Sequence, residues 1–353
     1  MKIHLLSGFL GSGKTTAIQQ AAHVLIQQGI KTGVITNDQG AQLVDGGLFK
    51  KLGFPNCEVI NGCFCCNYND LDASIVSLCE TNATEVIFAE SVGSCTDIVA
   101  TVLKPLLQFR PGTQVTLSIF ADARLLQMIL IDGASSFDDA VRYIYLQQLK
   151  EAGIIVVNKI DLMDEAALLA IKIMMQKRYA GKILLYQNSL NTDSIQQWLQ
   201  VLDNSHSSPA LPSLNIDYDV YAAGEAKLAW VDQLLEICSP YNNAIQLATN
   251  LANAIYTAVC KQQYPIGHLK FLLNDETKMS FTSSMDASAP VILQPAASAT
   301  LLINIRVQTA PENITRLISN AIAAIETISG CSIIVNNHSA FQPGYPRPAY
   351  RIG

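Results

Sequence analysis

The sequence predicts an α/β protein in which a mostly parallel sheet flanked by helices is followed by a smaller C-terminal α+β domain. Between residues 2 and about 190, short runs rich in Ile, Val and Leu alternate with longer amphipathic stretches. Alternation of this kind is typical of strands joined by crossover helices, and continuous apolar runs are typical of strands buried on both faces. The expected strands are 2–7, 31–36, 85–89, 114–121, 153–157 and 182–186.

A polar, proline-broken stretch over 203–214 marks the expected domain boundary. We therefore predict a first domain over 1–202, a linker over 203–214 and a second domain over 215–353. Its expected strands are 216–222, 266–273, 279–281, 299–307 and 332–336, and its expected helices are 226–238, 242–262 and 312–329. The tail, 341–353, is rich in Pro and Gly and is expected to lie as an extended arm over the surface. We expect the second domain to recognise a partner protein, and the sequence leaves open whether it also mediates a homodimer.

Composition excludes two classes of partner. The chain has 23 basic and 29 acidic residues and a formal net charge of -6, so it offers no basic surface for nucleic acid or for an anionic membrane. No apolar run approaches the roughly 20 residues that span a bilayer. The nine cysteines cluster rather than spread evenly, which favours a reducing cytoplasm over a disulfide framework.

A phosphate-binding loop is predicted at Gly8-Phe9-Leu10-Gly11-Ser12-Gly13-Lys14-Thr15, which matches G-x-x-x-x-G-K-[ST] between an apolar strand and a helix. Its glycines let backbone N–H groups point inward, Lys14 reaches the β- and γ-phosphates, and Thr15 offers a hydroxyl to Mg²⁺. A chance glycine-rich turn is the alternative, and the complete match in this context argues against it. The fold class is therefore a P-loop NTPase, although this motif does not separate ATP from GTP.

Guanine is the expected base because Asn158-Lys159-Ile160-Asp161 has the N-K-x-D pattern and follows a predicted strand. The Asp161 carboxylate can accept hydrogen bonds from N1–H and the exocyclic amine of guanine, and adenine lacks this donor pair. An unpaired buried carboxylate penalises the wrong base. Lys159 is expected to lie along the base, Asn158 to tie the loop together, and Ser189 to bring a backbone N–H to the guanine carbonyl.

Two further segments follow predicted strands. Glu90-Ser91-Val92-Gly93 has the form of a Walker B strand closed by E-x-x-G. Glu90 is expected to hold Mg²⁺ through water or to orient the attacking water, and Gly93 to donate its N–H to the γ-phosphate. Asp38 is a candidate for holding Mg²⁺ indirectly or for binding a metal itself, and a simple turn explains its segment equally well.

Three thiols lie within four residues in Cys63-Phe64-Cys65-Cys66, with Cys57 close upstream. Soft thiolates so arranged favour Zn²⁺, Cu⁺ or related metals. A disulfide between neighbouring cysteines is strained, and packing as small apolar side chains is the other alternative. Because these thiols lie between the segments of Asp38 and Glu90, we expect nucleotide state to reshape them. The solitary cysteines, which we expect in the core, are Cys79, Cys95, Cys238, Cys260 and Cys331.

These motifs together resemble the CobW-type GTPases, relatives of the nickel-enzyme maturation factors HypB and UreG. The resemblance rests on residues 8–16, 62–66, 90–93 with Asp97 following, and 158–161. It implies slow hydrolysis of GTP to GDP and phosphate, binding of Zn²⁺, Co²⁺ or Ni²⁺ by the clustered cysteines, and delivery of metal to a metal- or cobalamin-dependent client. Two features depart from the family: Asp38-Gln39 stands where relatives carry Glu and an aromatic residue, and the five histidines are isolated.

The motifs define one predicted site, for which two other functions remain open. The predicted nucleotide-binding residues are Gly8, Gly11, Ser12, Gly13, Lys14, Thr15, Thr16, Asn158, Lys159, Asp161 and Ser189. The predicted catalytic residues are Lys14, Glu90 and Gly93. The predicted metal ligands are Thr15, Asp38, Glu90, Cys63, Cys65 and Cys66. One rival is a P-loop kinase of a small molecule, for which the N-K-x-D match is coincidental. The other is a nucleotide-gated adaptor for a corrinoid protein, in which the cysteines serve structure or redox sensing.

Overall fold

The computed structural model describes residues 1–353 except 41–43, 45–48, 51, 134–136, 206–210 and 283–293. The chain divides into two compact units. The first unit comprises Met1–Gln39, Leu52–Gly224 and Tyr345–Gly353, and the second comprises Gly40–Lys51 and Glu225–Gly344. By this division the linker predicted over 203–214 lies in the first unit, and the end of the chain returns to that unit.

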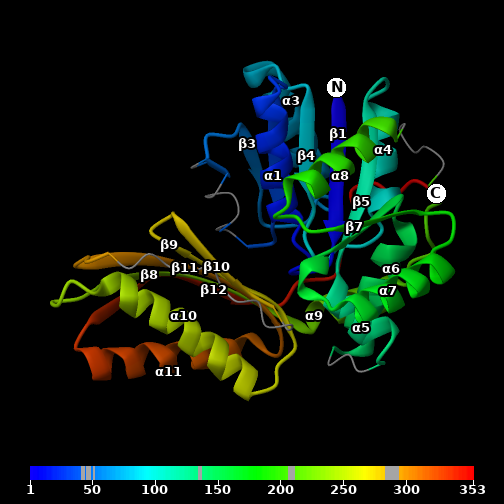
Figure 1. The fold of residues 1–353 in the computed structure, drawn as a ribbon. Helices are drawn as coiled ribbons and strands as arrows, with labels where there is room; N and C mark the ends of the chain where they lie inside the picture. The colour runs from blue at the N-terminus through cyan, green and yellow to red at the C-terminus, as the bar shows by residue number, and fades with distance from the viewer. Residues whose placement is uncertain (41–43, 45–48, 51, 134–136, 206–210, 283–293) are drawn as a thin grey trace. The chain divides into compact units, whose positions relative to one another are not determined.

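The first unit is built on a seven-stranded sheet with the strand order β3-β2-β4-β1-β5-β6-β7 (Figure 1). All neighbouring strands run parallel, which confirms the predicted sheet. The strands are β1 Lys2–Gly8, β2 Thr32–Asn37, β3 Asn56–Val59, β4 Val86–Glu90, β5 Gln114–Asp122, β6 Ile154–Asn158 and β7 Ile183–Gln187. The sequence does not predict the short edge strand β3, because its residues Asn-Cys-Glu-Val form no apolar run.

Helices flank this sheet (Figure 1). They are α1 Lys14–Gln27, α3 Tyr68–Asn82, α4 Lys104–Phe109, α5 Ala123–Leu130, α6 Asp139–Glu151, α7 Glu165–Arg178 and α8 Thr192–Asn204, with a π-helix η1 at Val99–Leu103 and a 3-10 turn η2 at Ile160–Leu162. Four of them begin at a side chain that accepts first-turn N–H groups, namely Asp122, Asp138, Asp164 and Asn191. Because the strands are parallel, the residues that follow β1, β2, β4 and β6 meet at one edge of the sheet.

The second unit is an α+β module, as the sequence predicts. Its five-stranded antiparallel sheet has the order β10-β9-β11-β8-β12. The strands are β8 Leu228–Cys238, β9 Ile266–Leu273, β10 Thr277–Phe281, β11 Ser298–Gln308 and β12 Ser332–Phe341, and the helices are α10 Ala244–Lys261 and α11 Pro311–Ser329. Apolar side chains of the sheet and of both helices form one buried core.

Two elements near the start of the predicted second domain differ from expectation. The predicted helix 226–238 is strand β8, whose first six residues are all buried, and a short apolar run of this kind does not reveal its period. The predicted strand 216–222 overlaps helix α9 (Tyr218–Ala226). Asp217 accepts hydrogen bonds from two N–H groups at the start of this helix, which is the local signal that fixes it.

Candidate functional site

The phosphate-binding loop joins β1 to α1. Gly8, Gly11 and Gly13 have φ angles of 129°, 74° and 89°, in the region that favours glycine. A Cβ on Gly8 would lie 2.1 Å from the carbonyl oxygen of Phe120 in β5, so strand packing also requires glycine there. Lys14 Nζ donates to the Gly8 carbonyl oxygen at 2.8 Å. A buried ammonium group thus lies against the loop at the start of α1, where the helix dipole favours an anion.

Glu90 ends β4 beside this loop. Its Oε1 accepts a hydrogen bond from Thr15 Oγ1 at 3.0 Å and lies 3.9 Å from Lys14 Nζ, and all three side chains are buried. Ser12 Oγ is also buried and has no hydrogen-bond partner among the described residues, and Thr16 is half-buried in the first turn of α1. Oxygen ligands beside a fixed ammonium group fit a Mg²⁺-bound triphosphate.

Gly93 lies against the backbone of the phosphate-binding loop. A Cβ at this position would be 2.9 Å from the backbone nitrogen of Leu10 and 2.7 Å from its Cδ2. Any larger residue would therefore push the loop that follows β4 away from the phosphate-binding loop. The close approach agrees with the expected position of Gly93, and its hydrogen bond to a γ-phosphate stays a prediction.

Asn158 joins three loops at the edge of the sheet. Its Nδ2 donates to the carbonyl oxygen of Ser12 at 2.9 Å, and its Oδ1 accepts from Ser189 N and Ser189 Oγ at 3.1 and 2.8 Å. A Cβ on Gly13 would lie 2.3 Å from Asn158 Nδ2. Asn158 therefore holds the phosphate-binding loop and the loop after β7 in fixed positions around the expected base site.

The base-reading segment also depends on Asp122, which the sequence analysis misses. Lys159 has a positive φ of 64°, and its Nζ lies 3.1 Å from Asp122 Oδ2. Asp122 is buried at the end of β5 and caps α5. The pattern that identifies Asn158 in the sequence also applies to Asp122, because both are polar residues that directly follow a predicted buried strand. Asp161 is exposed in η2, and its bonds to guanine stay a prediction.

Asn37, at the end of β2, holds the cysteine segment in place. Its Nδ2 donates to the carbonyl oxygens of Val59 and Gly62 at 2.9 and 2.6 Å, and its Oδ1 accepts from Phe64 N at 2.8 Å. One buried amide thereby fixes three points of the chain on either side of Cys63. Asp38 is half-buried, and its backbone N–H bonds to Val59.

The thiols of Cys63, Cys65 and Cys66, here called the thiol cluster, lie within 4.8 Å of one another. The sulfur distances are 2.8 Å for Cys63 and Cys65, 3.3 Å for Cys63 and Cys66, and 3.9 Å for Cys65 and Cys66. In a tetrahedral zinc site with Zn–S bonds of about 2.3 Å, sulfurs are about 3.8 Å apart, so small side-chain movements suffice. All nine cysteines are free thiols. The donor set fits a soft or borderline metal, and it includes neither Asp38 nor Glu90.

Hydrogen bonds among the thiols redistribute their protons. A hydrogen bond from Cys65 lowers the pKa of the Cys63 thiol well below its ordinary value, and the same bond raises the pKa of Cys65. The pKa of Cys66 rises to about 11, chiefly through its hydrogen bond to Cys63. Of the three thiols, Cys63 is therefore the one that loses its proton most readily, and a metal that binds all three sulfurs must displace the protons of the others.

Of the five cysteines expected to be solitary core residues, Cys331 is buried as expected, whereas Cys79 and Cys238 are half-buried. Cys260 is exposed on α10. Cys95 is fully buried, but its thiol hydrogen-bonds with the thiols of Cys63 and Cys65. The sequence gives no sign of this contact, because Cys95 belongs to a different loop from the thiol cluster. Cys57, which lies close to the motif in sequence, is not part of the cluster.

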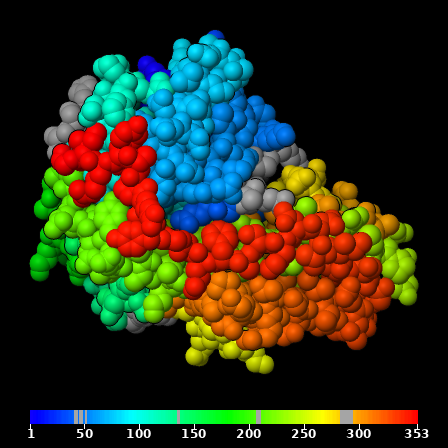
Figure 2. All heavy atoms as spheres, turned by 180° about the vertical axis from the view of Figure 1, so that it is seen from behind, coloured from blue at the N-terminus to red at the C-terminus, as the bar shows by residue number. Residues whose placement is uncertain are grey.

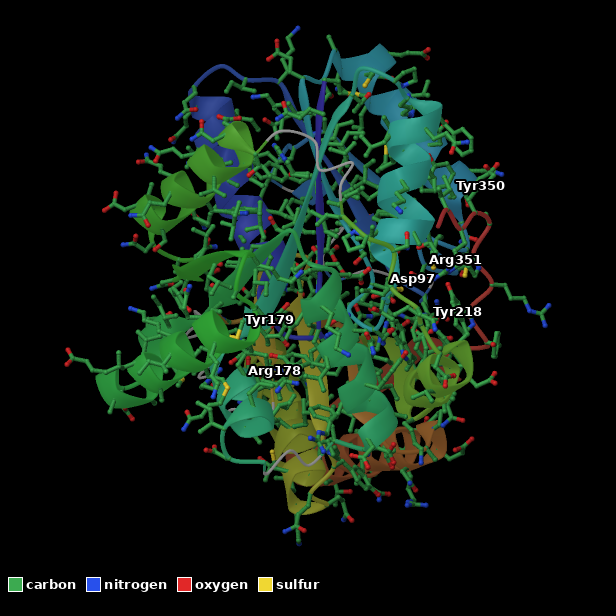
Figure 3. All side chains as sticks on the ribbon, turned by 90° about the vertical axis from the view of Figure 1, so that its right-hand side faces the viewer. Asp97, Arg178, Tyr179, Tyr218, Tyr350 and Arg351 are labelled. Atoms are coloured by element: carbon green, nitrogen blue, oxygen red, sulfur yellow. The ribbon has the colours of Figure 1, made fainter. Side chains whose placement is uncertain are left out.

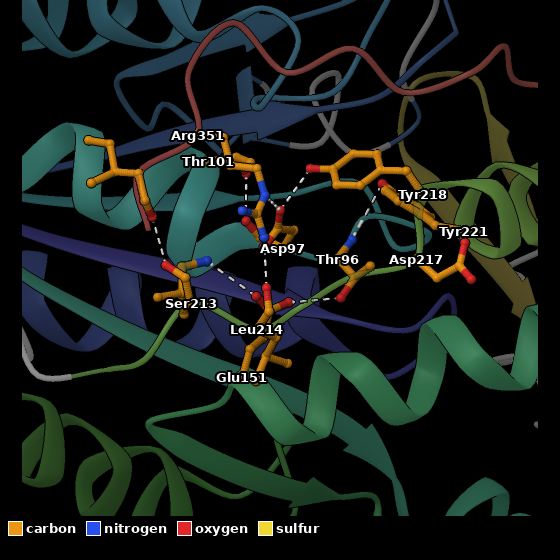
Figure 4. A network of polar contacts seen from close by, with 12 residues as sticks. Thr96, Asp97, Thr101, Glu151, Ser213, Leu214, Asp217, Tyr218, Tyr221 and Arg351 are labelled. Atoms are coloured by element: carbon orange, nitrogen blue, oxygen red, sulfur yellow. Dashed lines mark hydrogen bonds and ion pairs between the residues drawn. The ribbon is translucent and has the colours of Figure 1, made fainter.

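The loop after β4 is anchored to helix α6. Gln148 Nε2 donates to the carbonyl oxygens of Gly93 and Cys95 at 3.1 and 2.8 Å. One turn later, Glu151 accepts hydrogen bonds from Thr96 Oγ1 and Val99 N at 3.1 and 3.2 Å (Figure 4). Residues 90–97, here called loop 90–97, are therefore hydrogen-bonded to α6 and join the phosphate-binding loop to the thiol cluster.

The end of the chain also reaches the thiol cluster. Residues 345–353, here called the C-terminal arm, contain no helix or strand and lie on the surface of the first unit (Figure 2). The N–H of Ala349 donates to the carbonyl oxygen of Cys65 at 2.8 Å, and the N–H of Arg347 hydrogen-bonds to the Cys66 thiol. The arm thus contacts two of the three cysteines.

The C-terminal arm is fixed at Asp97, a buried residue with a φ of 66°. Asp97 Oδ2 accepts hydrogen bonds from Arg351 Nε at 2.8 Å and from Tyr218 Oη at 2.7 Å (Figures 3 and 4). Burial raises the pKa of Asp97, and these two hydrogen bonds oppose that shift. Asp97 follows the E-x-x-G segment closely in sequence, whereas Tyr218 and Arg351 are far away along the chain and no local pattern links them to it.

Together, the parallel sheet and the phosphate-binding loop define the first unit as a P-loop nucleotide-binding domain. The chain belongs to the CobW/HypB/UreG family, whose nucleotide-binding domain matches residues 2–183, just over half of the 353 residues. None of the helices in the part of the chain that the structure describes combines the length and the hydropathy of a membrane-spanning segment.

Similar proteins include zinc chaperones. The zinc chaperone YjiA of Escherichia coli (strain K12) is 32% identical over 142 residues, which cover 39% of this chain and 40% of that protein. The zinc chaperone CobW of Sinorhizobium sp is 28% identical over 202 residues, which cover 50% of this chain and 56% of that protein. The chain therefore spans about half the length of the curated relatives it matches. HypB from Helicobacter pylori, solved in complex with nickel, is 17% identical with a TM-score of 0.42, over 59% of this chain and 89% of that chain.

Proposed function

We propose that this chain is a GTP-binding, slowly GTP-hydrolysing metallochaperone whose nucleotide state sets its affinity for Zn²⁺ at the thiol cluster. One observation carries this proposal: loop 90–97 packs against the phosphate-binding loop at Gly93 and touches the thiol cluster at Cys95. A γ-phosphate that moves this loop would move groups beside the metal ligands. Zinc chaperones among the relatives favour Zn²⁺, and Co²⁺ and Ni²⁺ suit the same borderline donor set.

The nucleotide roles follow from the positions of the side chains. Lys14 would neutralise the β- and γ-phosphates, and Thr15 and Glu90 would supply oxygen ligands for Mg²⁺ directly or through water. Gly93 would donate its N–H to the γ-phosphate, and Asp161 would accept the two donors of guanine. Loss of the γ-phosphate removes the partner of Gly93, and loop 90–97 is then free to shift.

The metal is the cargo in this proposal. Cys63, Cys65 and Cys66 would hold it as thiolates, and each thiol gives up its proton to solvent when it binds. A site with three protein ligands leaves a tetrahedral position for a ligand of the acceptor. Transfer to a metalloenzyme or corrinoid-protein client then proceeds by ligand exchange. We assign recognition of that client to the second unit, and free thiols require a reducing compartment such as the cytoplasm.

Base specificity provides the first test. In Asp161→Asn the carboxylate becomes an amide, which can donate to the C2 carbonyl of xanthine and cannot accept both guanine donors. We expect the wild type to prefer GTP over ATP in competition binding, and the variant to prefer xanthosine triphosphate over GTP. Asp164→Asn is the matched control, because Asp164 lies nearby but caps α7. A clear preference of the wild type for ATP would contradict the proposal and favour a kinase.

Metal content provides the second test. Replacing Cys63, Cys65 and Cys66 together by Ser should remove the tightly bound Zn²⁺ from the purified full chain. The matched control replaces the same number of cysteines away from the site, at Cys79, Cys238 and Cys260. Unchanged zinc content in the first variant would rule out the thiol cluster as the cargo site and would favour the adaptor.

A further inference from the structure

Cys95 lies far from the cysteine motif in sequence but touches it in the structure. Its side chain is fully buried, and its thiol hydrogen-bonds with the thiols of Cys63 and Cys65. A cysteine that only fills the core needs apolar neighbours, whereas this one faces two sulfurs of a candidate metal site. A thiol from a separate loop therefore lies beside two of the three sulfurs of the thiol cluster.

The main chain at Cys95 is held so that the thiol stays at the cluster. The N–H of Cys95 donates to the carbonyl oxygen of Val92 at 3.1 Å, closing a tight turn. Its own carbonyl oxygen accepts from Gln148 Nε2 at 2.8 Å. With both backbone groups bonded, movement of the sulfur is limited to rotation of the side chain or to displacement of the whole loop.

We propose that Cys95 is a fourth ligand of the metal, so that the site binds Zn²⁺ through four thiolates. This assignment deepens the proposed function and rests on it. Tetrahedral coordination by four cysteines is a preferred arrangement for Zn²⁺, and all four thiols release their protons to solvent on binding. Cys95 is outside the set of sulfurs that lie within 4.8 Å of one another, so either Cys95 or Cys66 must move for all four to bind.

The position of Cys95 explains how nucleotide could act on the metal. Only Ser94 separates it from Gly93, whose backbone packs against Leu10 of the phosphate-binding loop. A shift of Gly93 would withdraw the Cys95 sulfur, while Cys63, Cys65 and Cys66 stay on their own loop. The site would change from four ligands, which retain metal, to three ligands with an open position, which can pass metal to an acceptor.

X-ray absorption spectroscopy of the zinc-loaded full chain, bound to Mg²⁺ and a non-hydrolysable GTP analogue, tests this directly. We expect four sulfur ligands in the wild type and three sulfurs with one oxygen or nitrogen in Cys95→Ser. Zn²⁺ affinity, measured by chelator competition, should fall at least about 10–100-fold, the loss typical even of outer-sphere changes at zinc sites. Cys331→Ser, a buried cysteine in the second unit, should keep four sulfurs and wild-type affinity.

The outcomes separate the two proposals. Three sulfurs in the wild type, or unchanged affinity in Cys95→Ser, would overturn the role of Cys95 and leave the thiol cluster as the cargo site. The wild-type sulfur count does not depend on whether the variant folds. A wild-type chain without thiolate-bound zinc would overturn both the role of Cys95 and the proposed function.

Discussion

Glu151 is a buried carboxyl group whose ionisation should control the stability of the first unit. It lies at the end of α6 and accepts hydrogen bonds from Thr96 Oγ1 and Val99 N. Burial raises its pKa to about 8 from an ordinary value of 4.5. The folded chain therefore keeps a proton on Glu151 at neutral pH that the unfolded chain releases.

The sign and size of the effect follow from that difference. A carboxyl group with a raised pKa in the folded state contributes most to the free energy of unfolding below pH 4.5. This contribution falls as the pH rises toward about 8. The pKa difference is 8 − 4.5 = 3.5, and each pKa unit corresponds to about 1.4 kcal/mol. The free energy of unfolding should thus fall by on the order of 5 kcal/mol across this window through Glu151 alone.

Glu151→Gln tests this reasoning. The amide stays neutral at every pH, and it can accept from Val99 N and donate to Thr96 Oγ1, so both contacts are kept. Urea unfolding at pH 5 and pH 9 measures the effect. Between these two pH values the free energy of unfolding of the wild type should fall by several kcal/mol more than that of the variant. The variant should be the more stable protein at pH 9. Glu80→Gln, at an exposed position of α3, is the control. Parallel pH profiles for the wild type and Glu151→Gln would refute the assigned burial effect.

Three further substitutions have defined outcomes. Asn158→Ala leaves buried groups of the phosphate-binding loop without a partner, so GTP affinity measured by calorimetry should fall about tenfold or more, equivalent to about 1–3 kcal/mol. Gly8→Ala forces a Cβ to within 2.1 Å of the Phe120 carbonyl oxygen, so the thermal unfolding midpoint should fall even without nucleotide. Arg351→Ala removes a partly exposed cation from Asp97, and the free energy of unfolding should fall by about 1 kcal/mol, with faster proteolysis of the C-terminal arm.

The fold of the first unit could be predicted because its signals are local. Apolar runs marked six of the seven strands, and the phosphate-binding loop could be placed between a strand and a helix. In a parallel sheet, this also locates residues such as Asn158 and Glu90 at one edge, since the ends of the strands meet there. Asp122 obeys the same rule and could have been found by extending the strand at 114–121 by one residue.

The rest depends on contacts that no local pattern encodes. Cys95 lies beside the thiol cluster in a loop whose carbonyl groups are hydrogen-bonded by Gln148 of α6, and no local pattern links it to the cysteine motif. Arg351 meets Asp97 across 254 residues of sequence, and the proline-rich tail gives no sign of its partner. The prediction of a helix at β8 was wrong. Burial on both faces of this strand hides the alternation of apolar and polar residues that identifies a strand.

The most direct test of the central claim is the affinity of the wild-type chain for Zn²⁺ in two nucleotide states. Chelator competition would compare the chain bound to Mg²⁺ and a non-hydrolysable GTP analogue with the chain bound to Mg²⁺ and GDP. Coupling between two sites of one protein is typically about 1–3 kcal/mol, so we predict affinities that differ by at least about fivefold. Equal affinities in the two states would contradict a link between the phosphate-binding loop and the thiol cluster.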